Sequence, residues 1–304
     1  MFDARESTEG KIVTLDRGDY TTCTVNLQGG TVVSWRINNE EQLFLGRRSS
    51  FSKFANIRGG VRLVWPHYHL WSFGRRHGFG RDMLWRVMKG PELLLNGDIF
   101  LDVCVTSNQY TKSMWNFDFE MHNRITLHSS QLTMAYTVIN KSPYFDFDFH
   151  INLQTYVKVS DISTMRIVGL ENFPYDDQVI TDGTSMFIEK EKEIRVQGEF
   201  DRIYQEVPKL VNIYMDKNKQ LSISLQNLPD LGFFNPGPEK AKKMDDLDDD
   251  EWKYFLVVQP AHVVSTIKLE RGTSWNMSVT LEVRRTDEKE IQYKNFYDYF
   301  DKYC

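Results

Sequence analysis

Residues 145–154 read FDFDFHINLQ, and this stretch indicates the class of fold. Every second position is apolar: Phe145, Phe147, Phe149, Ile151 and Leu153. The positions between them carry aspartate, histidine, asparagine or glutamine side chains. Because successive side chains of a β-strand point to opposite faces, this alternation predicts a strand with one face in the core and a polar face that includes Gln154.

The same two-residue period recurs along the chain, in residues 132–139, 221–226 and 277–283. Turn-forming sequences such as Asn96–Asp98 and Asn140–Pro143 separate these runs. Helical periodicity is nearly absent before residue 286. Many strands without intervening helices predict an all-β protein, built as an antiparallel sandwich or barrel. No linker-like sequence divides residues 11–285, so we expect a single domain there.

Residues 286–304 follow a different pattern. Their aromatic side chains recur at helical spacing, at Tyr293, Phe296, Tyr297 and Phe300. This spacing predicts a short amphipathic C-terminal helix that packs on the β-domain. A helix that binds a protein partner is the alternative.

The composition excludes several classes of protein. The chain has 304 residues, of which 41% are hydrophobic and 26% charged, with a formal net charge of −5. A chain with this much apolar surface can bury a large core, which excludes general disorder. Its mild acidity argues against a nucleic-acid-binding protein, which usually carries a concentrated basic surface.

The cysteines and the N-terminus indicate a reducing, cytoplasmic setting. The chain has three cysteines, Cys23, Cys104 and Cys304, which lie far apart in the sequence. An odd number of cysteines with no short spacing matches neither a disulfide framework nor a zinc motif. Residues 1–11 are charged and lack the apolar centre of a signal peptide. No segment approaches the roughly 18 apolar residues of a membrane span, so we expect no membrane association.

Residues 54–85 are richest in chemically active side chains: FANIRGGVRLVWPHYHLWSFGRRHGFGRDMLW. The segment contains five arginines, three histidines and five glycines, so it predicts a system of loops rather than a strand or helix. Arginine forks bind phosphate-like oxygens, which favours an anionic ligand, while a basic surface loop is an equal alternative. The histidine spacing matches no common zinc pattern, and we expect no metal site.

The acidic run Asp245–Glu251 lies between Met244 and a predicted strand near Tyr254. Carboxylates in sequence do not by themselves form a metal site, because a metal needs ligands placed around it. The run therefore predicts a solvated surface loop.

Several segments of residues 54–85 resemble a known signature. Ile57–Gly60, Trp65-Pro66 and His77–Arg81 are similar, in order and spacing, to the IRGG…WP…HGFAR motifs of hexose-6-phosphate mutarotases. These enzymes are also called glucose-6-phosphate 1-epimerases and form a branch of the aldose 1-epimerase superfamily. Further segments match in the same order: Gly30–Trp35, Gln154–Ile162, Gly198–Tyr204, Asn235–Met244 and Val257–Val263.

The resemblance implies a fold and a mechanism. The fold is a large antiparallel β-supersandwich of the galactose mutarotase type, in agreement with the alternation described above. The mechanism uses no cofactor. In the family a carboxylate takes the proton from the O1 hydroxyl while a histidine protonates the ring oxygen. The ring then opens, and its closure gives either anomer, which is general acid–base catalysis.

Residue by residue, the resemblance implies a retained binding site and altered proton transfer. Four residues expected to contact the sugar are present: Arg58, His77, Arg81 and Asp201. The family's proton-donating histidine falls on Gln154, and its general-base glutamate falls on Gln259. A glutamine amide donates and accepts hydrogen bonds but does not titrate in the working range, so it cannot move a proton.

Two other histidines are poorly placed to replace the missing groups. His150 lies four residues from Gln154, about 13 Å along an extended strand. His262 lies three residues beyond Gln259, on the opposite face of a regular strand. We expect both histidines to be structural.

The sequence therefore predicts a glucose-6-phosphate 1-epimerase-like protein that binds a sugar or sugar phosphate. Each acid or base group is worth roughly 10² to 10⁴ in rate, so anomer interconversion should be weak or lost. Two alternatives stay open. One is an active hexose-6-phosphate mutarotase that uses His77 and Asp201, and the other is a structural or interaction protein with a relic pocket. We expect no cofactor, and a protein partner could bind only through the C-terminal tail.

Overall fold

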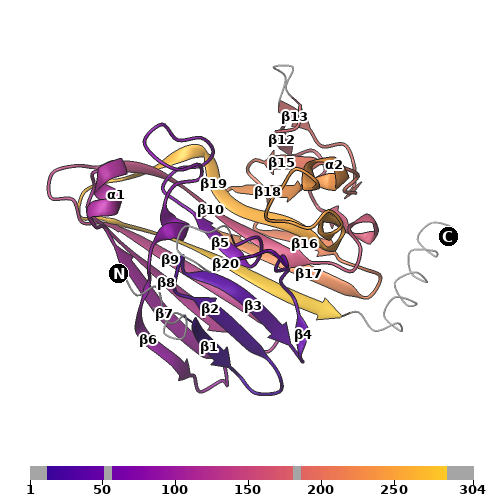
Figure 1. Cartoon of the computed structure of the whole chain (residues 1–304), viewed down its shortest axis with the longest axis horizontal. Coiled ribbons are helices and arrows are strands. Elements are labelled where there is room, and N and C mark those ends of the chain that lie inside the picture. Colours follow the sequence, from indigo (N-terminus) through magenta and orange to yellow (C-terminus); the bar gives the residue numbers. More distant parts are fainter. Residues whose placement is uncertain (1–11, 51–56, 181–185, 286–304) are drawn as a thin grey trace, which may run out of the picture.

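The computed structural model describes residues 12–50, 57–180 and 186–285. Within these ranges the chain forms two large β-sheets in which all neighbouring strands run antiparallel (Figure 1). The all-β sandwich prediction is confirmed. The helix predicted for residues 286–304 lies outside the described residues. The longest α-helix described has six residues, far fewer than a bilayer span requires.

The first sheet contains the strands that carry the candidate site. In spatial order its strands are β1 (Ile12–Asp16), β2 (Thr22–Asn26), β3 (Thr31–Ile37), β5 (Val61–Val64), β10 (Phe147–Lys158), β19 (Phe255–Leu269), β18 (Asp230–Asn235), β15 (Phe200–Tyr204), β12 (Pro174–Asp177) and β13 (Met186–Ile188). The short strand β4 (Glu40–Glu41) pairs with β3 at the side.

The second sheet packs against the first. Its strands, in spatial order, are β14 (Glu193–Ile194), β11 (Arg166–Val168), β16 (Leu210–Tyr214), β17 (Lys219–Gln226), β20 (Ser274–Arg285), β9 (Gln131–Asn140), β8 (Phe119–Leu127), β7 (Ile99–Thr106) and β6 (Arg86–Leu93). The helical segments are α1 (Gln109–Met114), α2 (Gly237–Ala241), η2 (Gly80–Asp82), η3 (Ile162–Thr164) and η4 (Glu251–Tyr254).

The main core lies between the two sheets and follows the predicted alternation. Phe147, Phe149, Ile151 and Leu153 of β10 belong to it, and strand β9 alternates strictly between buried and half-buried residues. Phe145 was predicted to be the first core residue of the strand. This prediction is wrong, because β10 begins two residues later and the Phe145 side chain is 62% exposed.

The opposite face of the first sheet carries a second, smaller apolar cluster. Tyr156 of β10 and Val257 of β19 pack there with Phe44, Ala241 and other residues. Figure 1 places α2 over this end of the sheet, near β15 and β18. The segment that contains α2 and η4 therefore covers part of the sheet face that points away from the main core.

Asn235 holds this covering segment in place. Its side chain is fully buried, and its Nδ2 donates to the carbonyl oxygens of Trp252 and Phe255, both at 2.8 Å. Its Oδ1 accepts a bond of 2.9 Å from the backbone N–H of Gly237. One amide thus connects the end of β18 to α2 and to η4.

We predict that Asn235→Ala destabilises the fold by roughly 2–4 kcal/mol, because it leaves several buried backbone groups without partners. Urea denaturation measures the free energy of unfolding. The control is Asn276→Ala on β20, whose exposed side chain accepts a weak bond of 3.5 Å from Asn227 Nδ2. Equal stability of the two variants would contradict the anchoring role of Asn235.

Candidate functional site

A cavity of about 380 Å³ lies on the face of the first sheet that points away from the main core. Its lining residues are Arg58, Arg62, Tyr68, His69, Arg76, His77, Arg81, Gln154, Tyr156, Asp201, Phe234, Lys240, Met244, Val257 and Gln259. The structure therefore brings together all six residues that the sequence singled out: Arg58, His77, Arg81, Gln154, Asp201 and Gln259. The volume is typical of pockets for small molecules.

Two glutamines form the floor of the cavity. Gln154 lies on β10 and Gln259 on the adjacent β19, one residue away from core positions Leu153 and Val258. Gln259 is buried, and its Oε1 accepts from Asn152 Nδ2 at 3.3 Å and Gln154 Nε2 at 3.5 Å. The two positions implied for acid and base thus lie within hydrogen-bond distance of each other.

A glycine provides the space that Gln259 occupies. Gly232 of β18 lies directly opposite Gln259 in the sheet. A Cβ atom at Gly232 would lie 3.2 Å from Gln259 Nε2, closer than side chains ordinarily pack. The glycine therefore leaves room for the long amide side chain.

The Ile57–Gly60 motif brings Arg62 next to the glutamines. Gly60 has a φ of +67°, and a Cβ atom there would lie 2.2 Å from the carbonyl oxygen of Val32. Only glycine allows this close approach of β5 to β3. In the resulting register Arg62 is paired with Gln154, and it is buried with 6% of its surface exposed.

Arg58 is held by protein groups at the rim of the cavity. Its Nη2 donates to both carboxylate oxygens of Asp246 at 2.8 Å, and its Nη1 donates to the Tyr156 hydroxyl at 3.1 Å. Burial alone would raise the pKa of Tyr156, but Arg58 and Arg62 hold it below its ordinary value. Arg58 therefore fixes the covering segment while it also lines the cavity.

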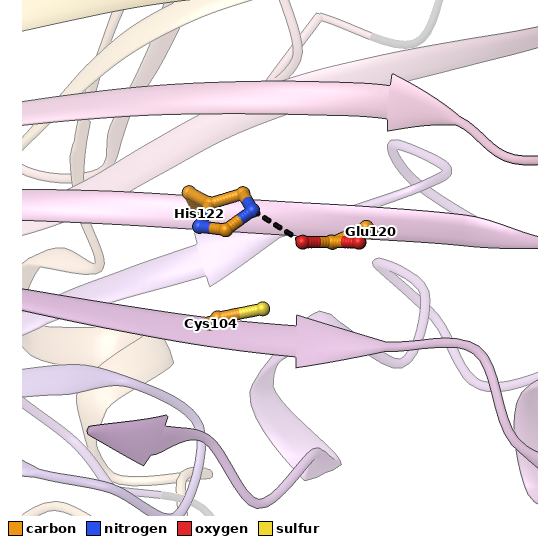
Figure 2. Close-up of side chains that lie close together, drawn as sticks. All are labelled: Cys104, Glu120 and His122. Carbon is orange, nitrogen blue, oxygen red and sulfur yellow. Dashed lines mark hydrogen bonds and ion pairs between the residues drawn. The ribbon is translucent and has the colours of Figure 1, made fainter. Parts of the chain in front are cut away.

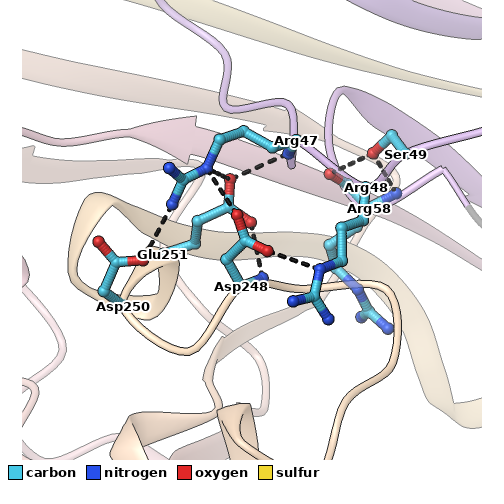
Figure 3. Close-up of polar contacts among 7 residues, drawn as sticks. All are labelled: Arg47, Arg48, Ser49, Arg58, Asp248, Asp250 and Glu251. Carbon is cyan, nitrogen blue, oxygen red and sulfur yellow. Dashed lines mark hydrogen bonds and ion pairs between the residues drawn. The ribbon is translucent and has the colours of Figure 1, made fainter.

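The acidic run forms an ion-pair network, so the prediction of a solvated loop is wrong for most of it. Figure 3 shows the network, in which Arg47 binds Asp248 at 2.8 Å and Asp250 at 2.9 Å. Arg48 binds Asp248 at 2.6 Å. The Glu251 side chain is buried and accepts from the Arg47 backbone N–H at 2.9 Å. These contacts connect the segment before β5 to the segment that covers the cavity.

His77 projects from the loop before η2 and is held as a neutral imidazole. Its Nδ1 accepts from the His69 backbone N–H at 3.2 Å, which places the ring proton on Nε2. Burial, together with Arg76 and Arg81, lowers the pKa of His77 to about 3. The following Gly78 has a φ of +72° and packs against the Trp65 carbonyl, where a Cβ atom would lie at 2.2 Å.

Positive charge dominates the cavity. Among the described residues that line it, five are cations and only Asp201 is a carboxylate. Lys240 pairs with Glu199 at 2.7 Å, whereas none of the described carboxylates forms an ion pair with Arg62, Arg76 or Arg81. Burial and the nearby Arg62 lower the pKa of Arg81 to about 10, and burial and Arg58 lower the pKa of Arg62.

Asp201 of β15 is the acidic group of the cavity. Burial raises its pKa to about 6, although Lys240 and Arg76 oppose this shift. The carboxyl group therefore titrates near neutral pH. The same burial keeps the phenol of the neighbouring Tyr68 protonated, because it raises the pKa of that group above its ordinary value.

The two histidines considered as replacements for the missing groups lie outside the cavity. His150 and His262 do not line the cavity in the part of the chain that is described, as expected from strand geometry. His150 Nδ1 accepts weakly from the Tyr68 N–H at 3.5 Å, and His262 lines a separate shallow hollow beside Trp275. Neither can replace a group at Gln154 or Gln259.

Sequence patterns missed several lining residues. Tyr68, His69 and Arg76 lie in the predicted loop system, but nothing in their spacing separated them from the exposed residues around them. Lys240 and Met244 come from the segment after β18, and Asp246 belongs to a run that was predicted to be solvated. Their roles depend on contacts between segments far apart in the chain.

Comparisons with known proteins agree with the geometry. The sequence profile of the family described as aldose 1-epimerase matches residues 11–282. A candidate glucose-6-phosphate 1-epimerase of Cenchrus ciliaris is 32% identical over 277 residues, which cover 87% of this chain and 82% of the relative. A candidate glucose-6-phosphate 1-epimerase of Escherichia coli is 26% identical, with 85% of this chain and 86% of the relative covered.

A solved structure has the same fold. The crystal structure of a candidate mutarotase, YeaD, from Salmonella typhimurium superposes with a TM-score of 0.81 at 20% sequence identity and covers 90% of each chain. The family profile spans nearly the whole described domain, and the resemblance noted in the sequence is confirmed. The chain belongs to the aldose 1-epimerase family.

Proposed function

We propose that the cavity binds a hexose phosphate and that the protein interconverts the anomers of this ligand weakly or not at all. The observation that carries the proposal is the combination of three arginines without carboxylate partners, Arg62, Arg76 and Arg81, with an amide pair, Gln154 and Gln259. The names of the relatives support a sugar phosphate as the ligand class.

The arginines favour an anionic ligand on energetic grounds. A buried guanidinium without a counter-charge is costly, and a bound anion compensates this cost through charge-assisted hydrogen bonds. Arg62 is the clearest case, because it is buried, none of the described carboxylates forms an ion pair with it, and the nearby Arg58 lowers its pKa further. A phosphate group would supply oxygen acceptors for several forks at once.

The amide pair favours binding without efficient proton transfer. Gln154 and Gln259 can hold the O1 hydroxyl and the ring oxygen of a sugar through hydrogen bonds, but neither can accept or release a proton. His77 is neutral in the free protein, and a neutral imidazole is a poor proton donor. Bound anions would raise its pKa by reducing the field of the arginines.

A specific observation favours retained activity as a second candidate function. Asp201 lines the cavity, and its pKa of about 6 suits a general base at neutral pH. In this candidate Asp201 accepts the O1 proton while His77 acts on the ring oxygen. The relic-pocket alternative is disfavoured, because burial raises the pKa of Asp201, and the ionised carboxylate therefore costs stability at neutral pH unless a ligand uses it.

For binding, we predict that glucose 6-phosphate raises the melting temperature and that glucose raises it much less. Arg62→Met and Arg81→Met should each weaken glucose 6-phosphate binding roughly 10- to 100-fold, since each removes charge-assisted hydrogen bonds. Titration calorimetry measures the dissociation constants. The matched control is Arg124→Met, which removes an exposed arginine that pairs with Asp102 at 2.6 Å on the second sheet.

If no hexose phosphate changes the melting temperature, the proposed class of ligand is wrong. Arg58→Ala is expected both to weaken binding and to lower stability, because it leaves Asp246 without its partner. This double effect distinguishes Arg58 from Arg62.

For catalysis, we predict that the double variant with Gln154→His and Gln259→Glu interconverts anomers at least roughly 10²-fold faster than either single variant. The reason is that the proton donor and the proton acceptor must act on the same sugar. A glutamate side chain at position 259 would have the shape of the glutamine, and Asn152 would remain beside it as a donor. Nuclear magnetic resonance exchange spectroscopy of glucose 6-phosphate anomers gives the rates. Gln226→Glu on β17, outside the cavity, is the control.

Fast, saturable exchange by the wild-type protein would overturn the proposal of weak activity. It would instead support the second candidate, provided that Asp201→Asn abolished the exchange and the rate fell as the pH dropped through about 6.

For stability, we predict that Asp201→Asn raises the melting temperature more above about pH 6 than near pH 4. The folded pKa of about 6 exceeds the ordinary value of 3.8, so the folded state binds a proton that the unfolded state has lost. Ionised Asp201 therefore costs stability as the pH rises through this window, and asparagine removes the cost. Differential scanning calorimetry tests this, with exposed Asp249→Asn as the control. An equal change at both pH values would contradict the prediction.

A further inference from the structure

Three metal-ligating side chains lie together on the solvent-facing side of the second sheet, remote from the cavity. Cys104 belongs to β7, and Glu120 and His122 belong to the neighbouring β8. One ligand atom from each lies within 4.8 Å of the other two. Figure 2 shows Glu120 and His122 on one strand with Cys104 beside them on the next.

Strand geometry explains why the three side chains meet. Cys104 and His122 are directly opposite each other in the register of β7 and β8. Glu120 lies two residues before His122, so both project from the same face of β8. The adjacent residues Val103, Val105 and Met121 point the other way, into the main core.

From this arrangement we propose that Cys104, Glu120 and His122 form a binding site for a zinc ion. Thiolate, imidazole and carboxylate are the ligand types that zinc prefers, at about 2.0–2.3 Å from the metal. Tetrahedral ligands at these distances are separated by about 3.5 Å, so small side-chain rotations would convert the observed cluster into three ligands. Water would fill the fourth position.

The site differs in its donors from a second histidine–carboxylate pair, which lies where β7 begins and β8 ends. His128 Nδ1 lies 2.6 Å from Asp98, a distance equal to that between His122 Nε2 and Glu120. Among the described residues, no cysteine joins His128 and Asp98 to make a group of three ligands that could hold a metal. Cys104 is therefore the feature that turns an ordinary polar pair into a three-donor set.

Charge and access are compatible with zinc. Cys104 is buried beneath its neighbours, whereas the side chains of His122 and Glu120 are about one-third and one-quarter exposed, at 35% and 24%. Arg86 Nη2 lies 4.0 Å from the sulfur, and Lys141 lies 3.8 Å from Glu120. Both cations have exposed side chains, and they can turn toward solvent when a metal ion takes their place beside the sulfur and the carboxylate.

Zinc binding would release one proton from the site. The Cys104 thiol loses its proton to solvent and the sulfur–zinc bond forms. The His122 ring keeps one proton on the nitrogen that does not bind the metal, while its other nitrogen and the Glu120 carboxylate donate lone pairs. Thiolate and carboxylate together neutralise the two charges of the ion. Burial raises the pKa of the thiol while Arg86 opposes this shift, so zinc must compete with a proton. A bound ion would connect β7 to β8.

The experiment uses the full-length chain with Cys304→Ser, so that a terminal thiol does not contribute. We expect reduced protein to bind one Zn²⁺ in native mass spectrometry and calorimetry, and Co²⁺ to give a thiolate-to-cobalt charge-transfer band. Cys104→Ser and His122→Ala should weaken binding at least about tenfold and remove that band, since even outer-shell changes cost roughly 10- to 100-fold.

Matched controls keep the result interpretable. Cys23→Ser changes a thiol buried between the sheets, and His128→Ala changes the pair that lacks a thiol. Both should retain zinc binding, and far-ultraviolet circular dichroism verifies that each variant folds. No zinc binding at micromolar concentration by the folded, reduced protein would overturn the proposal. Unchanged binding or an unchanged cobalt band in folded Cys104→Ser would do so as well.

Discussion

The alternation of side chains along the β10–β19 pair is the constraint on which the rest of the structure depends. These are the two longest strands of the first sheet, and they run antiparallel at its centre. One face of the pair supplies Leu153 and Val258 to the main core, and the other presents Gln154 and Gln259 to the cavity. A shift of one residue in register would turn the glutamines into the main core and the core residues toward the cavity, so core packing also aligns the site.

The electrostatics of the cavity depend on which charges are already paired. Arg58 is satisfied by Asp246 and Tyr156, and it joins the covering segment to the sheet. Arg62 and Arg81 lack carboxylate partners among the described residues, and their burial keeps the effective dielectric low. The arginines therefore divide into a group that supports the architecture and a group that is available to an anionic ligand.

The two sheets carry different chemistry on their outer faces. The outer face of the first sheet is covered by α2, η4 and the loop that contains His77, which creates a cavity. The second sheet instead presents polar side chains such as Asp102 and Arg124 to solvent, and Cys104 lies among them. A thiol on such a face is unusual for a residue that otherwise behaves as a small apolar group.

The sequence by itself determined the fold class and most of the cavity floor. Period-two alternation depends only on neighbouring residues, so the strands could be predicted, and Gln154 and Gln259 could be placed by family resemblance. The exposure of Phe145, the pairing of Asp246 with Arg58 and the meeting of Cys104 with His122 were decided only by the tertiary structure. The physical reason is that each of these depends on strand ends, loop paths or register between segments, and such contacts leave no periodic trace in the chain.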